Sequence, residues 1–322
     1  MSVTDEVLGI LENNKGNFVS GNEISKKLFV SRNSVWKAVN SLKLQGYDIE
    51  SVTNKGYRLS RDNDIISVQS VGKYLSYDLN IIIVDETDST NNYLKKLASD
   101  GEREGTVVIA RSQTKGKGRR GKSFYSPENT GVYFSLLLKP NGSVEKSLFL
   151  TVMAAVAVAE TAMEYSNRDI AIKWVNDVYI DGKKICGILT EGSVSLENGG
   201  LDYAVVGIGI NVLTPENGFP EEIKDIATAI FSKNEAPSDA KSRIIAGVLQ
   251  RLLDMYYGKD RDFIERYKSY SFLIGKKINI IYHDCTEPAE VLGITDECHL
   301  TVKTERGEIK TLSSGDVSVR VK

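Results

Sequence analysis

The strongest constraint on the fold is a pair of helix starts in the first sixty residues. Ser20 and Ser31 are of the type that caps helix N-termini, and apolar residues follow each at helical spacing. Between the first of these helices and the second cap lie only Phe29 and Val30. Because a connection this short joins the two helices of a helix-turn-helix, the pattern predicts that motif.

The outward face of the second helix and the segment after it suggest contact with nucleic acid. Alternating residues from Tyr47 and a turn at Asn54-Lys55-Gly56 predict a two-stranded hairpin, the wing of a winged helix. The segment Lys26–Arg58 has seven basic and two acidic residues, so it carries +5 within a chain of −2. We therefore predict DNA binding; the alternatives are a solvated basic face or a winged helix that contacts proteins. The predicted DNA-binding residues are Arg32, Asn33, Lys37, Asn40 and Lys55.

Composition narrows the chemistry that the rest of the chain can perform. Only two of its 322 residues are histidine, which excludes a histidine-rich metal site and leaves Lys, Arg, carboxylates and backbone groups for catalysis. No apolar run reaches the roughly 18–20 residues of a membrane span. Three cysteines and the lack of a basic start followed by an apolar run predict a cytoplasmic location. We expect several domains and no contact with a membrane.

A strand that leads into a helix provides the first candidate binding corner. Ile81–Val84 predicts a buried strand, and Asp88-Ser89-Thr90-Asn91 leads from it into a helix that contains Leu94. Hydroxyl and carboxamide groups at such a corner lie beside free backbone N–H groups and can bind an anion or a small polar ring. The alternative is that Ser89 and Thr90 only cap the helix.

A basic, glycine-rich loop provides the second candidate. Gly116-Lys117-Gly118-Arg119-Arg120-Gly121 follows a predicted strand and Gln113, and it satisfies the pattern GxGxxG. A dinucleotide-binding loop must open a helix, whereas turn-forming residues here lead into the strand Gly131–Leu138. Lys115–Lys122 holds five basic residues and no acid, which suits a polyphosphate. The alternative is a solvated basic loop.

Further polar groups and exposed backbone come from three later segments. The pair Asn176-Asp177 can hold a hydrated Mg²⁺ that bridges phosphates. The pair Asp181-Gly182 predicts a type I′ hairpin whose returning strand brings Lys184 within reach of a phosphoryl oxygen, unless that lysine is simply exposed. Gly207 and Gly209, two residues apart in a predicted strand, expose backbone along one sheet face for close contact with a ligand.

These elements predict an α+β protein of three domains. We expect a winged helix-turn-helix over residues 1–62, a mixed α/β catalytic domain with a largely antiparallel sheet over 63–272, and an SH3-like β-barrel over 273–322. Helices that back the central sheet are predicted over 147–166, 221–231 and 238–257. Five short alternating runs after residue 276 predict the strands of the barrel.

Four possible zinc ligands lie in the predicted barrel, namely His283, Cys285, Cys298 and His299. Cys298 and His299 are neighbours on a predicted strand, where successive side chains point to opposite faces. We therefore expect them to pack in the barrel and not to bind zinc together.

Taken in series, these motifs resemble those of the biotin protein ligases, in particular the bifunctional class that also represses the biotin operon. The resemblance covers the whole chain, and the order and spacing of the motifs agree. The matching segments are Asp88-Ser89-Thr90-Asn91, Gly116-Lys117-Gly118-Arg119-Arg120-Gly121, Lys173-Trp174-Val175-Asn176-Asp177, Gly182-Lys183-Lys184-Ile185-Cys186-Gly187-Ile188-Leu189 and Gly207-Ile208-Gly209-Ile210-Asn211.

The resemblance implies an enzyme that activates biotin with ATP and Mg²⁺ to biotinyl-5′-AMP. It then transfers biotin to one lysine of a biotin carboxyl carrier domain of the acetyl-CoA carboxylase type. The same protein would bind operator DNA as a homodimer in the adenylate-bound state and repress biotin synthesis genes, with biotinyl-AMP as corepressor. Attack of a carboxylate on the α-phosphate needs charge neutralisation and in-line positioning, not a general base, which agrees with the scarcity of histidine.

The resemblance also implies roles for individual residues. Lys117, Arg119 and Lys184 would be catalytic, and the nucleotide and its Mg²⁺ would contact Asn176, Asp177 and Asn211, with no metal site made of protein groups alone. The residues expected to bind biotin or biotinyl-AMP are Ser89, Thr90, Asn91, Gln113, Lys117, Gly118, Arg119, Lys184, Gly207 and Gly209.

Three residues depart from the usual pattern of the family. Lys117 stands where Arg is usual and replaces a bidentate fork with a point charge; Val175 stands where Pro is usual, and Phe124 where Trp is common. None of them removes a catalytic group. One alternative is a ligand-sensing repressor without ligase activity, against which Arg119 and Lys184 argue. Another is a lipoate ligase, which the basic loop and the winged helix disfavour.

Overall fold

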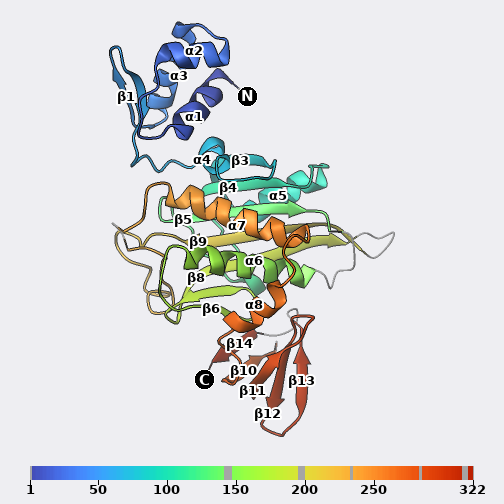
Figure 1. Cartoon of the computed structure of the whole chain (residues 1–322). Helices are drawn as coiled ribbons and strands as arrows, with labels where there is room; N and C mark the ends of the chain where they lie inside the picture. Colours follow the sequence, from blue (N-terminus) through green and yellow to red (C-terminus); the bar gives the residue numbers. More distant parts are fainter. Residues whose placement is uncertain are drawn as a thin grey trace. The chain divides into compact units, whose positions relative to one another are not determined.

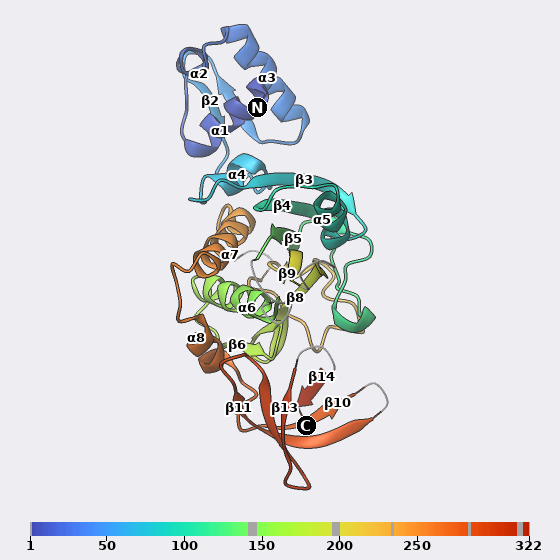
Figure 2. The same cartoon turned by 90° about the vertical axis from the view of Figure 1, so that its right-hand side faces the viewer.

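The computed structural model describes residues 2–140, 147–194, 200–232, 235–282, 285–313 and 318–321 (Figures 1 and 2). The chain divides into two compact units. One consists of Met1–Ser76 with Ala236–Ala246, and the other of Tyr77–Glu235 with Gly247–Lys322. None of the helices in the described residues has both the length and the apolar character that crossing a membrane requires.

Three helices and a hairpin make up most of the first unit. They are α1 (Val3–Asn13), α2 (Gly21–Leu28), α3 (Arg32–Leu44) and the antiparallel strands β1 (Ile49–Val52) and β2 (Gly56–Leu59), followed by α4 (Val68–Gly72). The oxygens of Ser20 and Ser31 accept hydrogen bonds from the N–H groups of Glu23 and Ser34 at 3.1 and 3.0 Å. Phe29 ends α2 with φ +55°, so the chain turns within two residues and enters α3. The predicted helix-turn-helix is confirmed.

A buried ionic cluster joins residues 236–246 to the rest of this unit. Asp239 accepts hydrogen bonds from Lys73 Nζ at 2.9 Å and Tyr74 Oη at 3.1 Å, and it also pairs with Lys15. Lys73 Nζ lies 2.8 Å from Glu12 Oε2. Burial alone would raise the pKa of Asp239, but the hydrogen bonds from Lys15 and Lys73 outweigh burial and lower it.

A seven-stranded sheet forms the frame of the second unit, with the strand order β3-β4-β5-β9-β8-β7-β6. Only the β3–β4 pair in this order is parallel, so the sheet is largely antiparallel as predicted. The strands are β3 (Asn80–Thr87), β4 (Thr106–Gln113), β5 (Gly131–Leu138), β6 (Ile170–Lys173), β7 (Asp177–Ile180), β8 (Lys183–Val194) and β9 (Leu201–Asn211).

Helices cover both faces of this sheet. α5 (Thr90–Ser99) packs on β4, β5 and β9, whereas α6 (Ser147–Met163) packs on β6, β8 and β9. Figure 2 shows α5 and α6 on opposite faces. The helices predicted over 147–166 and 238–257 are therefore present, as α6 and α7 (Ala240–Tyr256), and α8 (Phe263–Tyr270) follows.

The register of β5, β9 and β8 determines which residues share the face beneath α5. Side chains alternate between the two faces of a strand, so aligned residues and their second neighbours face the same way. One row across the strands is Ser135, Gly207 and Leu189, and the next is Tyr133, Gly209 and Gly187. Apolar residues of α5 pack on the same face further along, against Leu137 and Val205.

The C-terminal residues form a separate five-stranded antiparallel sheet in the order β13-β12-β11-β10-β14. The five predicted strands are present as β10 (Lys277–Ile281), β11 (Thr286–Ile294), β12 (Leu300–Thr304), β13 (Ile309–Leu312) and β14 (Ser318–Val321).

Two details of the prediction for the C-terminal residues need correction or fall outside the structure. Cys298 and His299 precede β12, so the prediction that they lie on a strand is wrong; Cys298 has φ +63°, which extended backbone does not allow. His283 lies outside the described residues. Among the residues that the structure describes, no three or more His, Cys, Asp or Glu side chains gather where they could hold a metal ion.

The helix predicted over residues 221–231 is wrong. Residues 221–226 form turns, and Ala227 and Phe231 then form isolated parallel bridges with Lys184 and Leu213. The carbonyl of Ile226 accepts from Lys184 N at 2.8 Å, and the N–H groups of Thr228 and Ile230 donate to the carbonyls of Lys184 and Asn211. Because these backbone groups bond to the sheet, they are not available for the hydrogen bonds of a helix.

Candidate functional site

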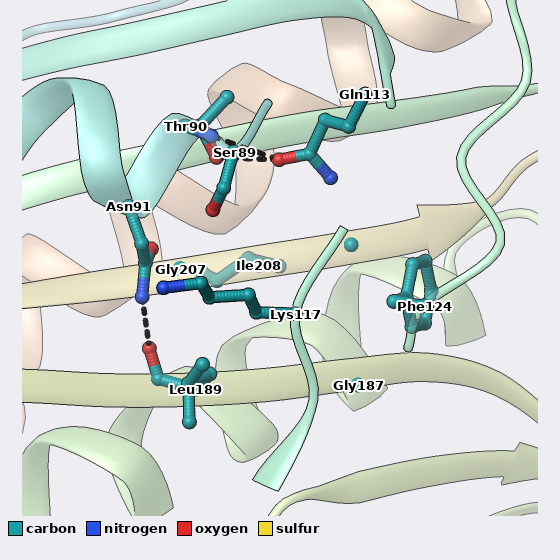
Figure 3. Close-up of a pocket in the computed structure, with 11 residues that line it drawn as sticks. Ser89, Thr90, Asn91, Gln113, Lys117, Phe124, Gly187, Leu189, Gly207 and Ile208 are labelled. Atoms are coloured by element: carbon teal, nitrogen blue, oxygen red, sulfur yellow. Dashed lines mark hydrogen bonds between the residues drawn. The ribbon is translucent and has the colours of Figure 1, made fainter. Parts of the chain in front are cut away.

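A pocket lies on the sheet face beneath α5, and we call it the polar pocket (Figure 3). The start of α5, the end of β4 and the basic loop supply its polar side chains, and β9 and β8 supply its floor. All residues predicted to bind biotin or its adenylate line this pocket, apart from Gly118, Arg119 and Lys184. The lining residues are Ser89, Thr90, Asn91, Gln113, Lys117, Phe124, Gly187, Leu189, Gly207, Ile208 and Gly209.

The first residues of α5 do more than cap the helix. Ser89 occupies the N-cap position and is 2% exposed, yet its side chain makes no capping hydrogen bond. The N–H and the hydroxyl of Thr90 lie 2.9 and 3.2 Å from Gln113 Oε1 (Figure 3). Gln113 Nε2 in turn donates to Ser126 Oγ at 3.0 Å. Capping alone therefore does not account for Ser89 and Thr90.

Asn91 is fixed by three partners on two strands, β8 and β5. Its Nδ2 donates to the Leu189 carbonyl at 3.1 Å and to Glu191 Oε2 at 2.8 Å, and its Oδ1 accepts from Ser135 Oγ at 2.7 Å. A Cβ on Gly207 would lie 2.0 Å from Asn91 Oδ1. Gly207 therefore leaves room for the Asn91 side chain, which lines the pocket. The sequence had predicted that this glycine leaves room for the ligand itself.

Phe124 occupies the space above the second glycine. A Cβ on Gly209 would lie 2.6 Å from Phe124 Cε1, and one on Gly187 would lie 3.2 Å from Cε2. The ring also makes an edge contact with Tyr133, with centroids 6.5 Å apart. The Phe124 ring thus packs directly against the backbone of Gly187 and Gly209, and it forms one wall of the polar pocket.

A second pocket adjoins the first and shares Lys117, Phe124 and Gly187 with it; we call it the cationic pocket. Five basic side chains and one acidic side chain line it, so its surface is strongly positive. The lining residues are Lys117, Gly118, Arg119, Arg120, Lys122, Ser123, Phe124, Asn176, Asp177, Lys184, Gly187 and Ile188. The structure thus brings the predicted residues Arg119, Asn176, Asp177 and Lys184 together.

Two of the basic groups are held by neighbouring polar side chains. Arg119 donates to Asn176 Oδ1 at 3.2 Å, and Lys184 Nζ lies 2.7 Å from Asp177 Oδ1. Burial lowers the pKa of Arg119, and the Asp177 carboxylate partly offsets this effect. An arginine remains cationic under such conditions. The arrangement can therefore neutralise an anion without first recruiting mobile side chains.

The basic loop is also anchored to α5. Lys117 Nζ donates to Asn92 Oδ1 at 2.7 Å, and Asn92 Nδ2 donates to Asp88 Oδ2 at 2.6 Å. The hydrogen bond from Asn92 is the main reason why the pKa of Asp88 is lowered. Arg119–Gly121 forms only a single 3₁₀ turn, so the loop does not open a helix, as predicted.

The hairpin that carries Lys184 has the predicted turn. Asp181 and Gly182 have φ +48° and +75°, which is the type I′ combination. Asn211, predicted to contact the nucleotide, donates from Nδ2 to the Thr228 carbonyl at 3.0 Å and does not line either pocket.

The outward face of α3 in the first unit carries the predicted DNA-binding side chains. Arg32, Asn33 and Lys37 are exposed and Asn40 is half-buried. Lys55 is exposed in the hairpin turn, with Nζ 5.8 Å from the centre of the Phe18 ring. The inward face of α3 is apolar and buried, as its spacing predicted.

The sequence reasoning missed several residues of these sites. Trp36 lies on the exposed side of α3 and is 55% exposed. It was missed because only polar residues were considered for the outward face, although its helical spacing from Arg32, Asn33 and Asn40 places it on that face. Ser135 and Glu191 contact Asn91 from distant strands, and no local pattern gives the register of those strands. In the sequence, Phe124 stands out only as a departure from the family pattern.

Comparison with known proteins identifies the class of each part. Residues 83–211 match the biotin/lipoate A/B protein ligase family, residues 4–58 an HTH domain, and residues 273–320 the biotin protein ligase C terminal domain. Together with the two pockets and the helix-turn-helix, these matches define a ligase that carries a DNA-binding domain.

Similar whole proteins and structures narrow the class to one family. The chain is 36% identical over 313 residues to the bifunctional ligase/repressor BirA of Bacillus subtilis, with 94% of each chain covered. It is 25% identical to BirA of Escherichia coli, covering 98% and 96% of the two chains. The Aquifex aeolicus biotin protein ligase in complex with biotin and ATP has a TM-score of 0.62 at 30% identity, covering 76% of this chain and 99% of that one. The chain belongs to the bifunctional ligase/repressor family of biotin protein ligases.

Proposed function

We propose that this protein activates biotin with ATP to biotinyl-5′-AMP and transfers biotin to a lysine of a biotin carboxyl carrier domain. The observation that carries the proposal is the pair of adjoining pockets: one lined by hydroxyl, carboxamide and apolar groups, the other by five basic side chains. Biotin combines an uncharged polar ring with a carboxylate, and ATP supplies phosphates. The two pockets offer the matching chemistry side by side.

The polar pocket would hold the ureido ring of biotin. Ser89, Thr90, Asn91 and Gln113 offer donors and acceptors to the ring, and Phe124 and Ile208 offer apolar surface. Because Gly207 and Gly209 have no side chain, Asn91 and Phe124 can pack closely on the floor of the pocket. The biotin carboxylate would extend toward Lys117, Gly118 and Arg119, where the two pockets meet.

In the first reaction, a biotin carboxylate oxygen attacks the α-phosphorus of ATP. A new C(O)–O–P bond forms, the bond from the α-phosphorus to the bridging oxygen breaks, and pyrophosphate leaves. The nucleophile is already ionised, so no base is required. Arg119, Lys184 and Lys117 would neutralise the charge that grows on the phosphoryl oxygens and hold carboxylate and phosphate in line.

In the second reaction, the neutral amine of the acceptor lysine attacks the acyl carbon of biotinyl-AMP. An amide bond forms, the acyl–phosphate bond breaks, and AMP leaves with the electron pair, while the amine loses a proton to solvent. The cationic pocket stabilises AMP as leaving group in the same way that it stabilised the phosphate in the first reaction.

Mg²⁺ is proposed to enter with ATP. Asp177 and Asn176 offer carboxylate and amide oxygens at the cationic pocket, and Mg²⁺ commonly takes one or two carboxylates while phosphates and water complete its shell. When bound, the ion would supply further neutralisation of phosphate charge. Asn211 remains a proposed contact of the nucleotide.

The proposed repressor function rests on the first unit. Arg32, Asn33, Lys37 and Asn40 would contact operator DNA from α3, with the β1–β2 hairpin as a wing and Lys55 on a phosphate. We further propose biotinyl-AMP as corepressor, a homodimer in the adenylate-bound state, domain boundaries at 62/63 and 272/273, an SH3-like barrel at the C-terminus and a cytoplasmic location.

One assay tests the enzymatic proposal: ATP–pyrophosphate exchange with biotin, with lipoate and without added acid. We expect exchange with biotin alone. Exchange with lipoate in place of biotin would favour a lipoate ligase. DNA binding that responds to biotin, together with no exchange under any condition, would favour a repressor without ligase activity.

A further inference from the structure

We propose that Glu191, held by Lys95, is a positioning residue that fixes the polarity of the biotin pocket. Through Asn91 and Ser135 it makes the Thr90 hydroxyl oxygen a hydrogen-bond acceptor toward the ligand. This inference rests on the proposed function, because it concerns how the same pocket recognises a ring that carries N–H groups.

The chain of contacts begins at the carboxylate of Glu191. Glu191 lies on β8 two residues beyond Leu189, so its side chain points to the face beneath α5. Its Oε1 pairs with Lys95 Nζ at 2.5 Å, and its Oε2 accepts from Asn91 Nδ2 at 2.8 Å. A carboxylate can only accept, so the nitrogen of Asn91 must face Glu191. The Leu189 carbonyl, 3.1 Å from the same nitrogen, supports this orientation.

The orientation of Asn91 decides where the proton of Ser135 goes. With its nitrogen turned to Glu191, Asn91 presents Oδ1 to Ser135 Oγ at 2.7 Å. A carboxamide oxygen has no proton to donate, so Ser135 must donate. Ser135 is fully buried, and its one proton is thereby committed to Asn91. Ser135 Oγ has donor geometry toward Thr90 Oγ1 as well, at 2.8 Å, but its single proton can serve only one of the two contacts, and Asn91 Oδ1 brings no proton of its own. With that proton on Asn91, Ser135 presents only lone pairs to Thr90.

Thr90 is therefore surrounded by acceptors on its protein side. Ser135 Oγ accepts for the reason given above, and Gln113 Oε1, 3.2 Å from the hydroxyl, is identified as oxygen because it accepts from Thr90 N. The hydroxyl proton of Thr90 must point to one of these two atoms. Thr90 lines the polar pocket (Figure 3), so its remaining lone pair is available there to accept a hydrogen bond from a ligand N–H.

Lys95 keeps Glu191 in the ionised form that this chain of contacts needs. Burial alone would raise the pKa of Glu191, but the hydrogen bonds from Lys95 and Asn91 outweigh burial and lower it. Both partners are partly buried, at 27% and 30% side-chain exposure. Neither Lys95 nor Glu191 lines the polar pocket, so both act on the ligand only through other residues.

The substitution that tests this proposal is Glu191→Gln. Lys95 attracts the amide oxygen of the new glutamine, so the amide nitrogen turns toward Asn91 Nδ2 and a donor faces a donor. Asn91 loses its fixed orientation, and Thr90 is no longer forced to accept. We expect the KM for biotin in ATP–pyrophosphate exchange to rise about 10- to 100-fold with kcat nearly unchanged, as for loss of a ground-state hydrogen bond.

Ligand analogues separate polarity from a merely structural effect. The probes are the two cyclic carbamates in which oxygen replaces one ring N–H of biotin. Wild type should disfavour the carbamate that lacks the N–H facing Thr90 by at least about tenfold, because two lone pairs would then meet. In Glu191→Gln the hydroxyl can turn its proton to the ring oxygen, so this preference should largely disappear. An equal rise of KM for biotin and carbamates, with the preference intact, would overturn the proposal.

Two further variants secure the test. Lys95→Met added to Glu191→Gln frees the amide oxygen to face Asn91, so KM and preference should return close to wild type. Absence of this rescue would contradict the proposal. Ser135→Ala, which removes the intermediate hydroxyl, should lose the preference even if Glu191→Gln does not fold.

A matched control is Glu287→Gln, whose partner Lys310 lies 3.0 Å away with nearly the same exposure, 26% and 30%. It should leave both KM and preference unchanged. Failure of wild type to catalyse biotin-dependent exchange would refute the proposed function itself, whereas exchange with an unaltered preference in Glu191→Gln would refute only the role of Glu191.

Discussion

The carboxamide of Asn91 lies directly above the backbone of Gly207, so closely that a Cβ on the glycine would be 2.0 Å from Asn91 Oδ1. Asn91 is 3% exposed and its partners on β5 and β8 hold it in place, so it can move aside only by breaking these hydrogen bonds. The relationship explains why a strand with buried neighbours contains a glycine here.

Gly207→Ala should therefore damage the polar pocket without unfolding the protein. The methyl group would push the Asn91 carboxamide out of its hydrogen bonds, and we expect the KM for biotin to rise about 10- to 100-fold in pyrophosphate exchange. The control is Gly293→Ala in β11, where a Cβ would meet nothing within 4 Å. Equal KM values for the two variants would mean that the contact has no role in binding.

Gly209→Ala tests the contact with Phe124. The new Cβ would lie 2.6 Å from the phenyl ring, and overpacking of this kind costs about 1–3 kcal/mol. Phe124→Leu introduced together with Gly209→Ala should recover part of the lost biotin affinity, measured by isothermal titration. In a double-mutant cycle we expect a coupling energy of about 0.5–3 kcal/mol. Additive effects of the two changes would show that the ring and the glycine act independently.

Some of this site was predictable because its signals are local in sequence. The pair Asp181-Gly182 specifies a type I′ turn because both residue types tolerate positive φ. The charge of the basic loop can be read from its sequence, and its turn-forming residues predict that it does not open a helix. The roles of Ser135 and Glu191 were not predictable, because they depend on the register between β5, β9 and β8, which only long-range pairing sets.

The same distinction applies to the fold. The helix-turn-helix follows from caps and spacing within thirty residues, whereas the helix predicted over 221–231 fails because its backbone bonds to distant strands. The place of Asp239 in the first unit also has no local signal, since its partners Lys15 and Lys73 are far away in sequence.

Arg119→Ala should speed the loss of biotinyl-AMP. Arg119 is partly buried and donates to Asn176, so its removal takes away both a cation of the pocket and an anchor of the loop. We expect dissociation of the labelled adenylate to be about 10- to 100-fold faster and the loop to be cut more readily by trypsin at its remaining basic residues. Lys115→Ala removes the same charge from the same loop at an exposed position that lines neither pocket. If it released the adenylate equally fast, net loop charge would be responsible, and not the Arg119 contact.

Asp239→Asn should destabilise the first unit in a pH-dependent way. The folded-state pKa of Asp239 is lowered, so its ionic contribution to stability is complete above the unfolded value of about 3.9 and is lost as the pH falls through the folded pKa. At pH 7 the variant leaves Lys15 without its buried counter-charge and Lys73 with Glu12 alone, at a cost of about 3–5 kcal/mol. Hydrogen exchange of the α1 and α3 amides should show the lower stability at pH 7, and the difference in stability from wild type should narrow at acidic pH. The control is Asp62→Asn, at an exposed position of the same unit. A gap that is independent of pH would argue against an ionic role.

Arg32→Ala with Lys37→Ala should separate DNA binding from ligation. Both side chains are exposed on α3, so the double variant removes two charges from the proposed DNA-binding face and leaves the core of the unit intact. Against a duplex that the wild type selects from a random pool, affinity should fall. The dependence of log K on log salt should become shallower by about 0.9 for each lost phosphate contact.

Lys303→Ala with Arg306→Ala removes the same charge from exposed positions of the other unit and should leave both the affinity for DNA and its salt dependence unchanged. Biotin transfer should proceed at the wild-type rate in both double variants; a parallel loss of transfer and DNA binding in the α3 variant would mean that the two activities are not independent.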